Sequence, residues 1–360
     1  MKTIYVIDLE PISQRYTERL SCCVMEQIRN QAARTGIVVS LQRISGGETS
    51  GGTDPGAFFD FAENSAYQSQ QCEALARLFK KGCVKSGDEF FLLDAWNPNV
   101  FVVRKLACLS GLDVRLSGLW HAGSYDPNDF LGRVGDRQWL ALYESALAEA
   151  LDVSIFATEY HRQLFTSNFD VSAKRDLCRA GFPFEYLSRD LAAYGNQTKE
   201  NLIVFPHRLA PEKQPEIFRD LAPSFPDYQF VCCQDQQLSK HEYHSLLGRA
   251  RMVFSANLQE TLGIGVYEGL CCGALPFAPD RLSYREMYPD QWLYPSEWTE
   301  SWSHYNHHKY ELVDRMRSML SASEEDACGV REQLMVCARK VEAEFFTGTQ
   351  IYDQLLGGAS

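Results

Sequence analysis

The sequence lacks any apolar run that reaches the roughly 20 residues of a membrane span, and Asp8 interrupts the first apolar stretch where a signal peptide would continue. We therefore expect a cytoplasmic protein with no membrane partner. The sequence also lacks the Cys-x-x-Cys spacing, although it contains 12 cysteines. Scattered cysteines without that spacing indicate reduced, mostly buried thiols and predict no zinc site.

The chain is also short of positive charge, with 35 Lys and Arg against 47 Asp and Glu and a net charge of −12. This balance argues against a protein that coats nucleic acid nonspecifically. The deficit is uneven, because residues 1–200 carry 21 basic against 25 acidic residues and the remainder carries 14 against 22. A polyanionic partner would therefore meet the first half.

Two domains of ordinary size fit in 360 residues, and short apolar segments alternate with helical patterns in both halves. Such alternation predicts doubly wound parallel sheets, whose ligands bind beyond the carboxyl ends of the strands. Residues 180–200 have the composition of a linker, which gives a first domain over residues 1–185 and a second from residue 186. A Glu-rich helix is predicted from about residue 323 to residue 346.

The most informative stretch is LQETLGIGVYEGLCCGALPFAP, residues 258–279. Gly263 and Gly265 allow a backbone to pass close to a ligand, and the N–H groups that begin the following helix would face an anion such as a phosphate. Glu260 and Glu268 can reach one ligand only if the first lies in the loop and the second within the helix. Gly273 then ends the helix, and a buried strand follows. The plainer alternative is a buried strand-loop-helix with two solvated glutamates.

Two cations precede another predicted helix start, in the segment from Pro206 to Pro215. Cations ahead of a helix N-terminus oppose its dipole, at a cost of some tenths of a kcal/mol each, unless an anion lies between them. This favours Arg208 and Lys213 as ligands of a diphosphate. The alternative is a pair of solvated surface charges.

In the first half, polar and aromatic residues follow three predicted strands. Asp94 and Trp96 come after the strand 89–93, and His121 and Tyr125 come after the strand 114–119. A histidine at such a place is either structural or a hydrogen-bonding group for a ligand. Arg15 belongs to the loop after the first strand. We predict that Arg15, Asp94, Trp96 and Tyr125 bind the acceptor.

The glycine-rich segment 45–56, SGGETSGGTDPG, is either a surface linker or a mobile flap over the acceptor site. Its composition does not separate the two.

Glu-x7-Glu with glycines between, followed by a small-residue helix and Gly-Ala-Leu-Pro, resembles the donor-site signature of retaining glycosyltransferases of the GT-B fold, especially family 4. The resemblance covers most of residues 150–290. Through HRLAPEKQPEIF and ARMVFSANLQETLGIGVYEGLCCGALPFAPDRLSYREMYP it is especially similar to tRNA-queuosine mannosyltransferases. GLWHAGSYDPNDFLGR, in the first half, looks like uncharacterised glycosyltransferases of bacterial viruses. The usual glycines of the first loop are missing.

The resemblance implies two Rossmann-like domains facing a cleft, an acceptor domain over residues 1–185 and a donor domain over 186–334, with residues 335–360 returning to the first. It gives Arg208 and Lys213 the donor diphosphate and Glu268 the ribose hydroxyls. Glu260 and His121 take the transferred sugar as the catalytic residues, and the N–H groups of Leu262, Gly263 and Ile264 help to hold phosphate and sugar. The donor is a UDP-sugar or, less favoured, a GDP-sugar, with no other cofactor and no metal.

Three functions follow as expectations. The first is a retaining hexosyl- or pentosyltransferase that acts on a hydroxymethylated or hypermodified base in DNA. The second keeps the enzyme but makes the acceptor tRNA queuosine, a glycan, a lipid or a small metabolite. The absence of a basic amphipathic helix disfavours the lipid. The third is a nucleotide-binding module without catalysis.

Overall fold

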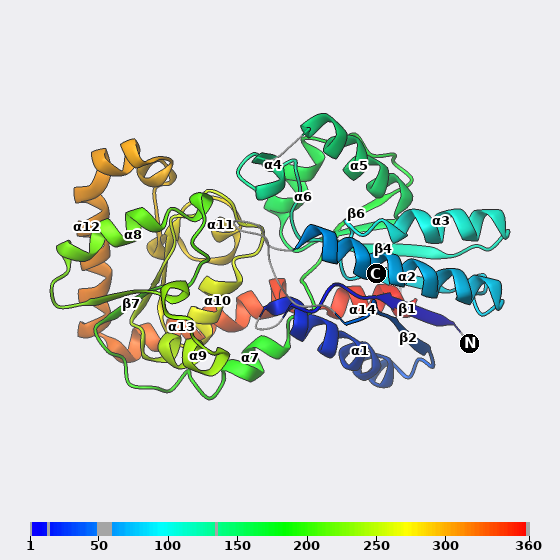
Figure 1. Cartoon of the computed structure of the whole chain (residues 1–360). Helices are drawn as coiled ribbons and strands as arrows, with labels where there is room; N and C mark the ends of the chain where they lie inside the picture. The colour runs from blue at the N-terminus through cyan, green and yellow to red at the C-terminus, as the bar shows by residue number, and fades with distance from the viewer. Residues whose placement is uncertain (1, 13–14, 49–59, 134–135, 358–360) are drawn as a thin grey trace. The chain divides into compact units, whose positions relative to one another are not determined.

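A computed structural model describes residues 2–12, 15–48, 60–133 and 136–357 (Figure 1). The chain divides into two compact units. Unit 1 comprises Met1–Phe184 and Thr347–Ser360, and unit 2 comprises Glu185–Phe346. The chain thus returns to unit 1 at residue 347, later than the predicted position 335, because the preceding helix runs to Phe345. Residues 49–56 of the glycine-rich segment lie outside the described residues.

Unit 1 is built on a six-stranded parallel sheet of order β2-β1-β3-β4-β5-β6. Its strands are β1 (Thr3–Ile7), β2 (Ser40–Ile44), β3 (Glu89–Leu92), β4 (Arg115–Trp120), β5 (Val153–Phe156) and β6 (Asp176–Arg179). The sequence analysis missed β6, because its four residues, DLCR, form a half-exposed edge strand with no apolar run. The parallel sheet confirms the predicted α/β class.

The helices of unit 1 are α1 (Tyr16–Thr35), α2 (Phe61–Lys80), α3 (Asn99–Leu109), α4 (Phe130–Arg133), α5 (Arg137–Ala150), α6 (Glu159–Thr166) and α14 (Thr349–Leu356). Thr158 is the N-cap of α6, since its hydroxyl accepts a hydrogen bond from the His161 N–H at 3.2 Å. Successive helices α2, α3 and α5 pack side by side, and α1 packs against α14 (Figure 1).

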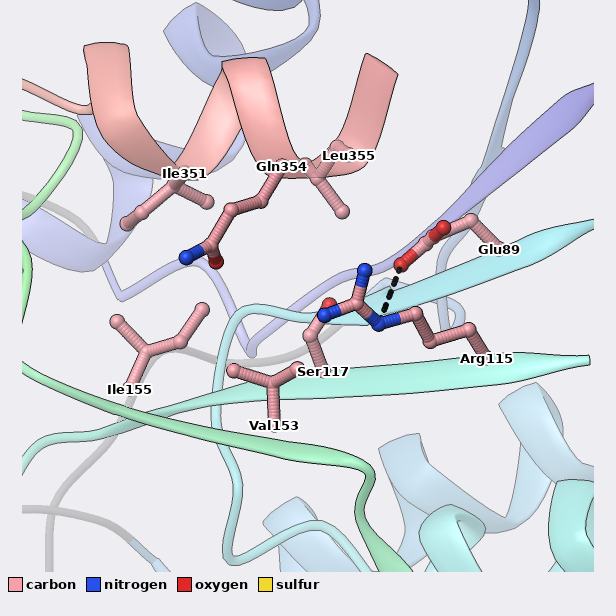
Figure 2. Close-up of a pocket in the computed structure, with 8 residues that line it drawn as sticks. All are labelled: Glu89, Arg115, Ser117, Val153, Ile155, Ile351, Gln354 and Leu355. Atoms are coloured by element: carbon pink, nitrogen blue, oxygen red, sulfur yellow. Dashed lines mark ion pairs between the residues drawn. The ribbon is translucent and has the colours of Figure 1, made fainter. Parts of the chain in front are cut away.

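Helix α14 covers part of the sheet with Ile351 and Leu355, which lie over Val153 and Ile155 of β5 (Figure 2). The alternate residue Phe156 belongs to the core on the opposite face. Beside this contact the Lys2 ammonium donates to the Leu355 carbonyl at 2.7 Å. The C-terminal helix is therefore an integral layer of unit 1.

Unit 2 has a five-stranded parallel sheet of order β11-β10-β9-β7-β8. Its strands are β7 (Leu202–Phe205), β8 (Gln229–Cys232), β9 (Met252–Phe254), β10 (Leu275–Pro279) and β11 (Leu293–Tyr294). Its α-helices are α7 (Tyr186–Leu191), α8 (Pro215–Leu221), α9 (Lys240–Arg249), α10 (Ile264–Cys271), α11 (Tyr284–Met287), α12 (Trp302–Glu325) and α13 (Ala327–Phe345). The two sheets confirm the predicted pair of doubly wound units.

Two predictions for unit 2 are wrong in detail. The supposed linker 180–200 contains α7, three of whose six residues are buried. The single helix predicted from residue 323 is instead the end of α12 followed by α13. The break occurs at Asp326, whose carboxylate accepts from the Gly329 N–H at 2.9 Å and so starts a new helix.

All twelve cysteines are free, but only four are buried, so the prediction of mostly buried thiols is wrong. Four of the others are partly exposed and four are exposed. Among the described residues, no helix combines the length and the apolar character that crossing a bilayer requires.

Lys199 joins the ends of two helices of unit 2. Its ammonium donates to the Gly248 carbonyl of α9 at 2.9 Å and to the Cys272 carbonyl after α10 at 2.6 Å. Burial lowers its pKa to about 8. Because this pKa lies below that of the unfolded chain, the unfolded chain binds more protons between about pH 8 and pH 10.5.

We therefore expect the free energy of unfolding of the parent to rise relative to that of Lys199→Met across this window, by up to about 3 kcal/mol. Buried thiols act in the opposite direction in both proteins, because burial raises the pKa of groups such as Cys233. Urea unfolding of the two proteins at pH 8 and pH 10 measures the difference. Lys174→Met, which replaces an exposed lysine, should follow the parent. An unchanged difference between parent and Lys199→Met contradicts the prediction.

Candidate functional site

The loops after β7 and β9 meet at one edge of the unit 2 sheet, because these strands are parallel neighbours. Pro206, His207 and Arg208 follow β7. The segment from Ser255 to Gly263 follows β9 and leads into α10. A β-carbon on Gly265 would lie 3.3 Å from the Pro206 ring. The loop after β7 therefore lies directly against the first turn of α10, and part of the need for glycine at position 265 comes from this packing.

Gly263 makes the turn into α10. Its φ of 77° lies in the left-handed region, and a β-carbon would lie 2.8 Å from the Tyr284 ring. Leu262 is buried beside it, and Ile264 is the first helical residue. As predicted, Glu260 lies in the loop and Glu268 within the helix. Gly273, with a φ of 77°, lies one residue after Cys272, the C-cap of α10.

Lys213 and Glu260 form an ion pair in this edge, with 3.4 Å between Nζ and Oε2. Lys213 is 5% exposed, and its ammonium also donates to the backbone carbonyl and the side chain of Gln259. Burial alone would raise the pKa of Glu260, but the nearby charge of Lys213 holds it below its usual value. Glu260 is thus ionised beside the Lys213 ammonium.

Arg208 pairs with Glu212 at 2.5 Å, across the turn that precedes α8. Glu212 is buried, and its carbonyl accepts from the Leu258 N–H at 2.8 Å. The side chain of Gln214 donates to the Ala256 carbonyl at 2.6 Å. The loops after β7 and β9 are therefore fixed to each other, and each predicted cation lies beside a carboxylate of the chain itself.

Two residues that the sequence analysis missed complete this edge. Asn257 is fully buried, and its amide nitrogen lies 2.9 Å from the Tyr284 hydroxyl, 3.3 Å from Glu260 Oε2 and 3.4 Å from His207 Nδ1. Burial, with a further contribution from Lys213, lowers the pKa of His207 to about 3. Their position directly after parallel strands was a signal in the sequence.

Glu268 is buried on α10 and faces α9. It accepts from the Tyr243 hydroxyl at 2.7 Å and lies 3.7 Å from the Lys240 ammonium and 3.9 Å from His244. Burial raises the pKa of this carboxyl, but His244, Lys240 and Tyr243 together bring it below its usual value. Glu268 is therefore an ionised acceptor at the same helix as the glycine turn.

In unit 1, His121 follows β4 and is half-buried. Its Nε2 donates to the Leu93 carbonyl at 2.7 Å, so Nδ1 faces the Tyr16 hydroxyl at 3.3 Å as an acceptor. Phe182 packs edge-on against the imidazole. Burial raises the pKa of Asp94, and His121 opposes this rise. The structure thus brings His121 and Asp94 together, and it adds Tyr16, which the sequence did not indicate.

Two further predicted residues, Trp96 and Tyr125, direct their polar atoms to other side chains of unit 1. Trp96 donates from Nε1 to Glu144 at 2.8 Å, and the buried Tyr125 hydroxyl lies 2.5 Å from His161 Nε2. Glu144 also accepts from the Ser124 N–H at 2.7 Å. The polar groups of Trp96 and Tyr125 therefore support the loop that carries His121.

Arg15 is half-buried at the N-cap of α1, and its backbone N–H donates to the Ile12 carbonyl at 3.1 Å. Within the described ranges, no group of three or more His, Cys, Asp or Glu side chains is arranged to hold a metal ion.

No family model matches the chain. Among solved structures, sucrose-phosphate synthase from Thermosynechococcus elongatus is similar with a TM-score of 0.63 and 13% identity, over 99% of this chain and 100% of that one. Trehalose 6-phosphate synthase from Burkholderia multivorans is similar with a TM-score of 0.63 and 13% identity, over 99% of this chain and 98% of that one. The catalytic domain of starch synthase IV from Arabidopsis thaliana is similar with a TM-score of 0.55 and 12% identity, over 99% of each chain. At these identities the similarity establishes the fold, and the chain has the GT-B fold of these glycosyltransferases.

Proposed function

We propose that the protein is a retaining glycosyltransferase that transfers a hexosyl or pentosyl group from a nucleotide-sugar donor to a hydroxyl acceptor. The observation that carries this proposal is the edge of unit 2, where the Lys213–Glu260 ion pair and Arg208 lie beside the glycine turn that begins α10. On a GT-B fold this edge offers cations and N–H groups for a diphosphate, and a carboxylate for sugar hydroxyls.

In the proposed mechanism the diphosphate competes with Glu212 for Arg208 and with Glu260 for Lys213. These cations and the N–H groups of Leu262, Gly263 and Ile264 stabilise the charge that develops on the leaving nucleotide. Glu268 accepts from the ribose hydroxyls. The acceptor oxygen bonds to the anomeric carbon on the face that the nucleotide leaves, the bond from that carbon to the diphosphate oxygen breaks, and the hydroxyl proton passes to the leaving diphosphate, with retention of configuration. The mechanism uses cations of the chain and requires no metal.

Glu260 and His121 act on the transferred sugar. Glu260 accepts from its hydroxyls, because its lowered pKa keeps it ionised. His121 offers Nδ1 as an acceptor, because Nε2 is held by the Leu93 carbonyl. UDP is the favoured nucleotide and GDP the alternative. The starch synthase IV structure contains ADP, which makes ADP the third nucleotide to test.

For the acceptor we propose a modified base in DNA, on the resemblance of GLWHAGSYDPNDFLGR to viral glycosyltransferases. The net charge of −12 weighs against a polyanion. The names of the similar synthases favour instead a sugar or a sugar phosphate as the alternative acceptor. Transfer to tRNA queuosine remains a third arm of the test.

The test has two stages. Nucleotide release from UDP-, GDP- and ADP-sugars identifies the donor, and mass spectrometry of modified DNA, tRNA and glycan acceptors after incubation identifies the product. An added hexose or pentose on a digested nucleoside supports the nucleic-acid acceptor, and an added mass on a glycan alone excludes it. If nucleotides bind but none is released with any acceptor, the protein is a nucleotide-binding module and the proposal fails.

A further inference from the structure

The edge of unit 2 contains two buried polar atoms that find no hydrogen-bond partner within the described part of the chain. They are His207 Nε2 and Asn257 Oδ1. His207 is 7% exposed and Asn257 is 0% exposed. Buried polar groups in folded proteins are nearly always paired, because a donor or acceptor removed from water without a partner is costly. The pair therefore points to a ligand that supplies the missing partners.

The hydrogen-bond geometry determines which nitrogen of His207 carries the proton. The Asn257 amide nitrogen has two protons: one faces the Tyr284 hydroxyl at 2.9 Å, and Glu260 Oε2 at 3.3 Å and His207 Nδ1 at 3.4 Å share the other, which makes Nδ1 an acceptor. The proton then lies on Nε2, the atom without a partner. The imidazole also stays neutral, because burial and the charge of Lys213 lower its pKa to about 3.

The location of His207 indicates which part of a ligand it meets. The preceding residue, Pro206, lies against Gly265 in the first turn of α10, and the following residue is Arg208. Lys213 lies near the His207 imidazole. Glu260 lies beside the Asn257 amide. An anion at the N-terminus of α10 would therefore lie close to a neutral N–H donor as well as to the two cations.

We propose that His207 donates a hydrogen bond from Nε2 to a phosphate oxygen of the nucleoside diphosphate, and that Asn257 is a positioning residue that holds the imidazole in this tautomer. The inference rests on the proposed function. It adds a ligand-contacting residue that acts without charge. Its contribution to binding is the same at pH 5.5 and at pH 8, unlike that of an ordinary histidine, which gains a proton as the pH falls from 8 to 5.5.

The test compares His207→Leu, which removes the donor, with His207→Gln, which retains an N–H donor. Calorimetry measures the binding of UDP, GDP and ADP to each protein, and uridine, guanosine and adenosine serve as probes without phosphate. For the diphosphate that binds the parent, we expect the Leu variant to bind about 10-fold more weakly, the loss of one hydrogen bond to a charged group. The Gln variant should stay within about threefold, and both variants should bind the nucleoside as the parent does. His307→Leu, an exposed site on α12, should change neither affinity.

The pH profile separates this role from a structural one. The ratio of parent to Gln-variant affinity for the diphosphate should be constant from pH 5.5 to pH 8, a comparison that remains informative if the Leu variant does not fold. A ratio that rises below pH 6.5, or equal losses of nucleoside and diphosphate affinity in the variants, overturns the inference and leaves the proposed function intact. If the parent binds none of the three diphosphates, the inference and the proposed function fail together.

Discussion

Replacement of Lys213 with Met should lower nucleotide release from the donor by about 10²- to 10³-fold, because a buried cation that stabilises the leaving diphosphate is lost. The same change should reduce the free energy of unfolding by roughly 1–3 kcal/mol, since Glu260 is left charged, three-quarters or more buried, and without its ion-pair partner. A coupled assay of nucleotide release and urea unfolding measure the two effects. Lys340→Met, at an exposed position of α13, is the matched control and should change neither quantity.

The double variant Lys213→Met/Glu260→Gln separates the two effects. Removing both charges removes the uncompensated carboxylate, so we expect most of the lost stability to return while nucleotide release stays low. Recovery of both quantities in the double variant would show that Lys213 acts only through the fold. A Lys213→Met protein with parental turnover would contradict the role of the ion pair in donor binding.

Replacement of His121 with Ala should lower kcat by about 10²-fold, the size expected for one preorganised hydrogen-bonding group in a transition state. Steady-state kinetics with the donor varied should show a much smaller change in KM, because the proposed contact is with the reacting sugar. His121 can make this contact only through Nδ1, because its Nε2 donates to the Leu93 carbonyl.

Tyr16→Phe is the companion variant, because the Tyr16 hydroxyl faces the same Nδ1 at 3.3 Å. If a sugar hydroxyl replaces that contact during turnover, Tyr16→Phe should remain within a few-fold of the parent. A Tyr16→Phe variant as impaired as His121→Ala would mean that the pair supports the loop rather than the sugar. Equal kcat in parent and His121→Ala would remove His121 from the mechanism.

The sequence predicted most of the sheet of each unit, because buried parallel strands such as β3 and β7 are short continuous apolar runs. It failed where the determinant is not apolar periodicity. The edge strand β6 is half-exposed, and α7 is too short to show a helical period. The break between α12 and α13 depends on a single capping contact of Asp326.

The candidate site was predictable to a similar depth. The glycine turn and the pair of cations each lie within a short stretch of sequence, and Gly263 does adopt the left-handed conformation that the turn requires. The Lys213–Glu260 pair was not predictable, because it joins the loops after two different strands, whereas Glu212 lies only four residues from Arg208 in the same loop. Asn257 was missed for the same reason, since its contacts to His207 and Tyr284 join three segments distant in the chain.

Helix α14 has a consequence for the order of events during synthesis. Unit 2 is one continuous segment, so all of it is synthesised before the helix that closes unit 1. Until then Val153 and Ile155 of β5 lie without the apolar cover of Ile351 and Leu355 (Figure 2). N-terminal domains ordinarily fold first as they emerge. In this chain the first unit cannot be completed until the last residues emerge, and its uncovered sheet face is the surface that a chaperone would meet.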